Sequence, residues 1–228
     1  MAAKEIMTLY HVVQARSFRC LWTMHELGLK DYRLVTMPFP PRYLAPGYKK
    51  INVLGTIPYF TDGPSVKMTE SCAIPVYLAE KYGQQSNLKV LPSEPDYAAY
   101  LNWIAHADAT LTFPQTVYLR YCLQETKAGL GDAGKAYAKW FFARMALLNN
   151  TLSDGREFLC AGRFTIADIC VSYALIIARQ LELEPDYGKI PDLTKAYLDR
   201  LKERPAFQSA CAEETESIKA WEEGRSKL

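Results

Sequence analysis

Glu70 and Ser71 are the residues whose type and place in this chain best suit ligand chemistry. They open a predicted helix, and Glu70 follows the strand-opening pair Ile57-Pro58 by twelve residues. A helix start offers backbone N–H groups and positive dipole charge, so an acidic ligand group can dock there without a dedicated arginine. Together the two pairs indicate a cradle for a ligand carboxylate.

The elements that position this cradle alternate between strand-like and helix-like patterns, which favours an α/β domain with a small sheet. A helix over Ser71–Tyr82 tolerates Pro75 because proline costs least near a first turn. The other expected elements are a strand over 6–11, a helix from Phe18 to Leu29 with Gly28 near its end, a strand over 32–37, a short helix ending near Lys50, and a hairpin of 58–61 with 66–68.

Beyond the cradle the composition changes twice. Residues 84–96 are rich in Gln, Ser, Asn and Pro, which is typical of a linker, and the periodicity after them is helical. The predicted organisation is a domain over 1–83, a linker over 84–96 and an all-helical domain over 97–228. Helices are expected over 97–124, 133–152, 166–181, 193–202 and 206–221.

Composition excludes several partners. The net charge of +2 comes without a sustained basic block, so no nucleic acid or membrane surface is expected as a partner. Met1 to Met7 lacks the apolar core of a signal peptide, and no apolar run reaches the roughly 20 residues that span a bilayer, so we expect a cytoplasmic protein. The six cysteines lack metal-ligand spacing, which favours reduced thiols and no metal site.

Thr165 and Asp168 have the spacing of an N-terminal capping box. Buried Asp168 would satisfy N–H groups at the start of a core helix, so we assign this pair to structure rather than to catalysis.

The runs 52–60 and 68–74 resemble the glutathione-binding half of the glutathione transferases. The resemblance spans nearly the whole chain, because a small α/β domain followed by a helical one is that superfamily's plan. It implies a thioredoxin-like first domain, an all-α second domain, a homodimer, a detoxification role and glutathione as co-substrate. The enzyme would stabilise the glutathione thiolate and add it to an electrophilic, hydrophobic or aromatic small molecule.

The resemblance also implies which residues hold glutathione. Ile57, before a cis Pro58, would pair its backbone with the cysteinyl segment. Glu70 would accept from the γ-glutamyl ammonium, and Ser71 would donate to the γ-glutamyl carboxylate. Thr56 stands where the family often has a basic residue, so the glycyl carboxylate would fall to Arg42, Lys49 or Lys50, each of which could equally be a solvated charge.

Thiol activation is where the chain departs from the family, because Ala15 occupies the place of the catalytic serine. A thiol is mostly protonated at neutral pH, and a hydroxyl donor normally lowers its pKa. Ser17 could supply the hydroxyl or merely cap the helix. Tyr10 could point its phenol into the site or pack in the core. Arg16 and nearby backbone N–H groups could instead act without any hydroxyl.

The second substrate is expected where the helical domain faces the cradle. Candidate side chains combine apolar surface with hydrogen-bonding groups, although aromatic residues at helical spacing are more often core and a lone histidine is more often packing. The candidates are Trp103, His106, Thr110, Phe113, Tyr118 and Tyr121, and Pro114 is expected to kink their helix.

Three functions therefore stay open. The leading one is a glutathione transferase, with glutathione-dependent isomerases, etherases and peroxidases as close variants that begin from the same thiolate. The second is a binding protein that keeps the cradle but lost thiol activation with Ala15. The third is an interaction module without glutathione affinity, against which the Glu70-Ser71 pair argues.

Overall fold

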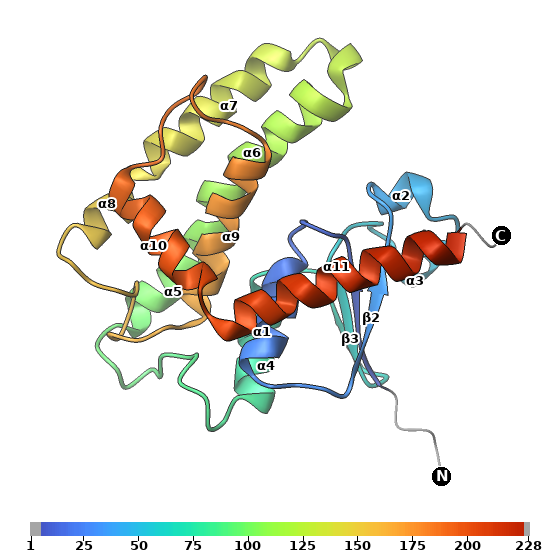
Figure 1. Ribbon diagram of the computed structural model, residues 1–228, viewed down its shortest axis with the longest axis horizontal. Helices are drawn as coiled ribbons and strands as arrows, with labels where there is room; N and C mark the ends of the chain where they lie inside the picture. The colour runs from blue at the N-terminus through green and yellow to red at the C-terminus, as the bar shows by residue number, and fades with distance from the viewer. Residues whose placement is uncertain (1–5, 226–228) are drawn as a thin grey trace. The chain divides into compact units, whose positions relative to one another are not determined.

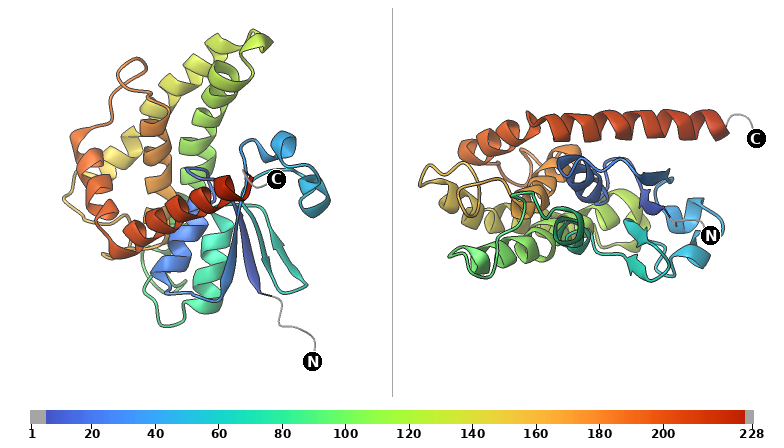
Figure 2. Two further views of the ribbon diagram at one scale, coloured as in Figure 1. Left: turned by 45° about the vertical axis from the view of Figure 1, so that its right-hand side comes forward. Right: turned by 90° about the horizontal axis from the view of Figure 1, so that it is seen from below.

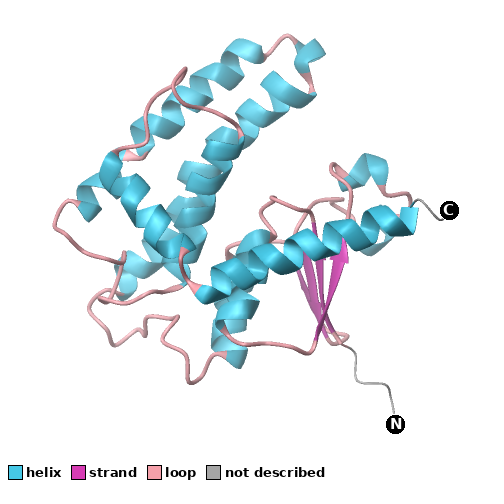
Figure 3. Ribbon diagram, in the orientation of Figure 1, coloured by secondary structure: helices cyan, strands magenta, loops and turns pink. Residues whose placement is uncertain are grey.

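The computed structural model describes residues 6–225. Contacts divide the chain into two compact units, of which unit 1 runs to Ser86 and resumes at Glu203, and unit 2 covers Asn87–Lys202. Unit 1 combines a mixed sheet with helices, and unit 2 is built from helices (Figures 1 and 3). The predicted fold class is thus confirmed.

The sheet of unit 1 has four strands in the order β2-β1-β3-β4. β1 pairs with β2 in parallel, and the other two pairings are antiparallel. A parallel pair needs a crossover connection, which the first helix supplies, whereas a short turn through Gly63 joins the β3–β4 hairpin. The strands are β1 (Met7–His11), β2 (Tyr32–Thr36), β3 (Tyr59–Asp62) and β4 (Val66–Met68).

Three of unit 1's five helices pack together near the sheet. α1 contacts α4, and α11 runs alongside α1 and β2 (Figure 2). The side chains of Phe18, Leu21 and Trp22 make α1 apolar on its buried face. The helices are α1 (Phe18–Glu26), α2 (Pro41–Leu44), α3 (Tyr48–Ile51), α4 (Ala73–Tyr82) and α11 (Pro205–Arg225).

The place of α11 differs from our prediction, which grouped it with the helical domain. Phe207 packs edge-on against Trp22 at 4.9 Å and against Phe18 at 5.4 Å between ring centroids. Arg204 donates two hydrogen bonds to the carboxylate of Glu26, at 2.7 and 2.8 Å. These contacts make α11 part of unit 1.

Unit 2 begins with one long helical run that changes character along its length. π-helical segments at His106–Thr112 and Leu119–Gln124 follow α5 (Tyr97–Ala105) and α6 (Phe113–Tyr118), and a 3₁₀ turn covers Thr126–Ala128. The first π segment ends two residues before Pro114, which has no N–H to donate. The side-chain amide of Gln115 donates to the carbonyl of Leu111 at 2.9 Å, so this backbone carbonyl accepts a hydrogen bond from a side chain.

α9 is the most buried helix of unit 2, and it packs against α5, the first π-helical segment and α10. The hydroxyl of Thr165 accepts from Ala167 N–H, and Asp168 accepts from Thr165 N–H at 2.8 Å, so the predicted capping box is confirmed. Burial raises the pKa of Asp168 to about 6, although its hydrogen bonds act to lower it. The remaining helices of unit 2 are α7 (Gly131–Arg144), α8 (Ala146–Leu152), α9 (Ile166–Gln180) and α10 (Asp192–Lys202).

The sequence predicts reduced cysteine thiols and no membrane-spanning segment. All six cysteines are free thiols, and four of them are buried: Cys20, Cys72, Cys160 and Cys170. Across residues 6–225, no helix is both long enough and apolar enough to cross a bilayer.

Candidate functional site

Glu70 and Ser71 lie in the turn that leads into α4. Glu70 is exposed, whereas Ser71 is buried. Arg19, which is fully buried on α1, donates from Nη1 to Ser71 Oγ at 2.8 Å. The start of α4 therefore combines helix N–H groups, a hydroxyl and a nearby guanidinium, an arrangement that attracts a carboxylate.

The segment before β3 holds the second predicted contact. The Ile57–Pro58 peptide is cis, as we expected from the resemblance. The carbonyl of Thr56 accepts from Tyr48 Oη at 2.8 Å and from Asn52 Nδ2 at 2.9 Å. The buried side of this segment is therefore held by hydrogen bonds to the Thr56 carbonyl, whereas Thr56 is exposed and Ile57 is partly exposed.

Two of the basic candidates flank this segment. Gly55 has a φ of 61°, and a Cβ added there would lie 2.8 Å from Arg42 Cβ and 3.4 Å from Lys49 Cγ. The Arg42 guanidinium sits 4.7 Å from the ring centroid of Tyr43. Lys49 and Lys50 are exposed. The backbone thus brings Arg42 and Lys49 next to Gly55.

Ser17 lies in the loop between β1 and α1, and it is fully buried. Its Oγ is 2.8 Å from His11 Nδ1 and accepts from Val12 N–H at 3.2 Å. Ser17 precedes α1, but its hydroxyl makes no capping hydrogen bond, so of the two alternatives for Ser17 the helix cap is wrong. The hydroxyl instead closes the loop back onto the end of β1.

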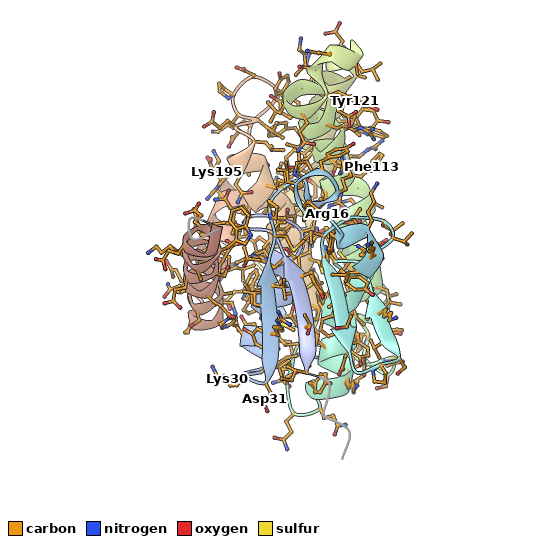
Figure 4. The ribbon with its side chains drawn as sticks, turned by 90° about the vertical axis from the view of Figure 1, so that its right-hand side faces the viewer. Arg16, Lys30, Asp31, Phe113, Tyr121 and Lys195 are labelled. Carbon is orange, nitrogen blue, oxygen red and sulfur yellow. The ribbon has the colours of Figure 1, made fainter. Side chains whose placement is uncertain are left out.

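The other two candidates for thiol activation differ from Ser17 in exposure. The Tyr10 ring is partly exposed and packs between Tyr48 and Tyr59, with centroids 5.8 and 5.7 Å away. Arg16 is partly exposed and lies at the opposite end of the strands from the Lys30–Asp31 turn (Figure 4). The roles of Tyr10 and Arg16 in thiol activation stay predictions.

Trp103 and His106 form the first group of the predicted substrate residues in unit 2. Their rings meet edge-on at 5.3 Å, and Trp103 is buried. Burial, together with the charge of Arg144, lowers the pKa of His106, which favours its neutral imidazole. His106 Nε2 is buried and has no hydrogen-bond partner among residues 6–225. Thr110 follows one turn later and is partly exposed.

Phe113 and Tyr118 have different neighbours. Phe113 is half exposed and meets Tyr137 at 6.1 Å. Tyr118 meets Tyr187 at 5.3 Å, and burial raises the pKa of Tyr118 to about 12, with Tyr187 adding to the shift. Tyr121, labelled near Phe113 in Figure 4, is partly exposed. Four of the predicted substrate residues, Trp103, His106, Phe113 and Tyr118, therefore belong to three separate ring pairs.

Two cavities are lined by none of these candidate residues. A mostly apolar one of about 410 Å³ belongs to unit 1 and is lined by Met37, Pro38, Leu44, Ala45 and Trp221. A polar one of about 440 Å³ belongs to unit 2 and is lined by Asp96, Asp154, Gly155, Arg156, Glu157, Phe158, Cys160, Ala161 and Gly162. Neither combines a carboxylate cradle with a thiol-binding loop, so we do not assign the site to them.

Comparison with known families bears on both units. Residues 5–80 match the family described as "Glutathione S-transferase, N-terminal domain", and residues 121–205 match "Glutathione S-transferase, C-terminal domain". The chain belongs to the glutathione transferase superfamily. The predicted family is thus confirmed from both halves of the sequence.

Individual glutathione transferases resemble this chain along most of its length. Glutathione S-transferase D6 of Drosophila melanogaster is 27% identical over 208 residues, which cover 90% of this chain and 92% of that protein. Glutathione S-transferase 3 of Schizosaccharomyces pombe is 26% identical, with 90% and 86% covered. The glutathione transferase URE2P5 of Phanerochaete chrysosporium has the same fold, with a TM-score of 0.80, 22% identity and coverage of 97% and 100%.

Sequence reasoning missed three residues that this glutathione transferase fold brings to the site. Arg19 stands on the apolar face of a helix, and His11 stands on the buried face of β1. A charged or titratable group at a buried position needs a polar partner, and that signal could have identified both. Glu214, described below, gave no such signal because its partners are far away in sequence.

Proposed function

We propose that this chain is a glutathione transferase that binds glutathione in unit 1 and adds its thiolate to an electrophilic aromatic molecule. The observation that carries the proposal is the exposed Glu70 beside Ser71, whose hydroxyl takes a hydrogen bond from buried Arg19 at 2.8 Å. Glu70 would accept from the γ-glutamyl ammonium, and Ser71 would donate to the adjacent carboxylate. The buried guanidinium of Arg19 would stabilise that carboxylate through its hydrogen bond to Ser71 Oγ.

The peptide part of glutathione would follow the Thr56–Pro58 segment. Because Tyr48 and Asn52 hold the Thr56 carbonyl, Ile57 can present its backbone to the cysteinyl residue without first being ordered. Arg42 and Lys49, next to Gly55, would bind the glycyl carboxylate, with exposed Lys50 as the further candidate.

The loop after β1 would stabilise the thiolate. The hydroxyl of Ser17 is occupied by His11 and Val12, so it would have to leave both to reach a thiol. Arg16 is partly exposed and carries a permanent charge, and we assign thiolate stabilisation to it and to the loop backbone. The reaction then needs no hydroxyl at Ala15.

Aromatic electrophiles are the substrate class that relatives support. The Ure2p5 protein of Phanerochaete chrysosporium was crystallised with 1-(S-glutathionyl)-2,4-dinitrobenzene, and URE2P6 of that fungus with oxidised glutathione. In the corresponding reaction the thiolate attacks the ring carbon of a 1-halo-2,4-dinitrobenzene, the carbon–sulfur bond forms and halide leaves. The rings of Phe113 and Tyr118 would suit such a ring, with His106, which packs on buried Trp103, and Thr110 as polar groups. We further propose a cytoplasmic homodimer that acts in detoxification.

A glutathione-binding protein without catalysis is the second candidate. Ala15 and the engaged Ser17 hydroxyl favour it, because they leave the loop without a free hydroxyl donor.

An ultraviolet difference titration of glutathione into the protein across pH separates these candidates. We expect saturable binding with thiolate absorbance at neutral pH, and halide release from the halodinitrobenzene. Glu70→Gln should weaken binding about tenfold, since it removes a charge-assisted hydrogen bond.

Matched variants assign the roles. Glu80→Gln, an exposed residue of the same α4 region, should leave binding unchanged. Arg16→Met should remove the thiolate signal, whereas Ser17→Ala and Tyr10→Phe should retain it. Binding without thiolate would favour the binding protein, and no binding at all would refute both candidates.

A further inference from the structure

The loop that follows β1 contains a left-handed turn at a residue other than glycine. Gln14 has a φ of 61°, a conformation that L side chains adopt at a cost. Its backbone N–H donates to Oε1 of Glu214 on α11 at 2.7 Å. A carboxylate acceptor makes this a charge-assisted bond, so Glu214 compensates for the disfavoured turn.

The same carboxylate oxygen also approaches the interior of the loop. His11 is fully buried, and its Nε2 lies 3.1 Å from Glu214 Oε1, within ion-pair distance but not aligned as a hydrogen bond. The other nitrogen of His11, Nδ1, lies 2.8 Å from Ser17 Oγ. Glu214 Oε1 therefore contacts both the backbone N–H of Gln14 in the loop and the buried imidazole of His11.

The position of Glu214 is fixed by contacts that do not involve the loop. Phe207 anchors α11 against α1, and Arg204 binds the carboxylate of Glu26. The carboxylate of the preceding residue, Glu213, lies 2.6 Å from His25 Nε2 and accepts from Tyr32 Oη. The side chain of Glu214 is only 11% exposed, so it reaches the loop from an anchored helix.

We propose that Glu214 is a positioning residue for the glutathione thiol. Its carboxylate holds the turn at Gln14 and thereby sets where Ala15 and Arg16 stand. This inference rests on the proposed function, in which that loop receives the thiolate. Small displacements of a stabilising group cost much activity, because electrostatic stabilisation depends on groups already in place.

The test compares Glu214→Ala and Glu214→Gln with Glu213→Ala and Glu213→Gln. Glu214→Ala should raise the pKa of the bound glutathione thiol and lower kcat/KM about tenfold or more. Glu214→Gln should fall between it and the unmodified protein, because its amide oxygen can still accept from Gln14 N–H. The Glu213 variants should lower the melting temperature without moving the thiol pKa, since His25 and Tyr32 lie outside the loop.

A second readout needs no ligand. Hydrogen exchange at the Gln14 amide should accelerate in Glu214→Ala and stay unchanged in the Glu213 variants. Equal thiol pKa values in Glu214→Ala and the unmodified protein would overturn the inference, as would unchanged Gln14 exchange. If the unmodified protein binds no glutathione, the proposed function fails and the thiol role of Glu214 falls with it. Exchange at Gln14 then separates that result from a failure of Glu214 to hold the loop.

Discussion

A buried cation lies next to the Ser71 hydroxyl, which we propose binds glutathione, so stability and the proposed function are linked in unit 1. Arg19 is fully buried and donates to Ser71 Oγ, while the Cys20 thiol lies 3.9 Å from the Ser71 carbonyl. Burial, and then the neighbouring Cys72, raises the pKa of Cys20, so its thiol stays protonated and unreactive. Of Arg19, Cys20 and Ser71, Ser71 is the residue that directly follows exposed Glu70 in the sequence.

Replacing Ser71 tests this link. Ser71→Ala leaves a guanidinium N–H of Arg19 without this acceptor in the interior, so we expect a loss of about 1–3 kcal/mol in the free energy of unfolding. Thr69→Ala is the control, because the Thr69 hydroxyl donates to the carboxylate of exposed Glu70 at 3.3 Å, and this change should alter stability by less than about 0.5 kcal/mol. Urea unfolding measures both, and equal effects would contradict the role of the Arg19 hydrogen bond.

Helix starts that depend on local sequence could be predicted, whereas contacts between distant segments could not. The Glu70-Ser71 pair and the Thr165–Asp168 box each lie within a few residues of the helix that they open. Glu214 meets Gln14 across 200 residues of chain, and no local pattern encodes such a pairing. The buried His11 signalled that a partner must exist, but not which residue it is.

Among the elements, the segment before α5 is the one whose behaviour departs most from expectation. Its composition is that of a linker, yet Arg163 donates to the carbonyls of Asn87 and Lys89 and to both carboxylate oxygens of Glu94. Ile166 N–H donates to the Leu88 carbonyl at 2.8 Å. One guanidinium therefore holds this segment onto the start of α9, as part of unit 2.

The pair of Glu94 and Arg163 should make stability depend on pH. Hydrogen bonds from Arg163, and then from Leu91 N–H, lower the pKa of Glu94 from 4.5 to about 2. A carboxylate whose pKa is lower in the folded than in the unfolded state stabilises the fold at pH values above the unfolded-state pKa. That stabilisation is lost as the pH falls to the folded-state pKa. Glu94→Gln should therefore be less stable than the unmodified protein at neutral pH, and the difference should shrink as the pH falls from 4.5 to about 2. Urea unfolding across that range measures it, and a difference that does not change with pH would disprove the pairing.

At the scale of the whole molecule, unit 1 is made from two stretches of sequence and unit 2 from one. α11 joins unit 1 through an aromatic cluster, two ion pairs and the Glu214 contact. Sequence periodicity identified α11 as a helix, but periodicity does not state which core a helix joins. The helical domain predicted for 97–228 therefore differs from the compact unit at Asn87–Lys202.

Phe207 should be essential to the stability of unit 1. Its side chain is 7% exposed, and Phe207→Ala would leave a cavity beside Trp22 and Phe18. We expect a loss of about 3–5 kcal/mol in the free energy of unfolding. Phe113→Ala, at a side chain that is 50% exposed, is the matched control and should cost much less. Thermal and urea unfolding compare the two, and similar losses would argue against a core role for α11.

The return of α11 to unit 1 sets the order in which the two units can be completed on the ribosome. Unit 2 is continuous, so every residue of its core has been synthesised once Lys202 is added. The residues that cover Phe18 and Trp22 come only after that point, although the sheet beside them is made first. Domains fold as units during synthesis. Until α11 follows, the nascent unit 1 therefore keeps Phe18 and Trp22 without the Phe207 ring that packs against them.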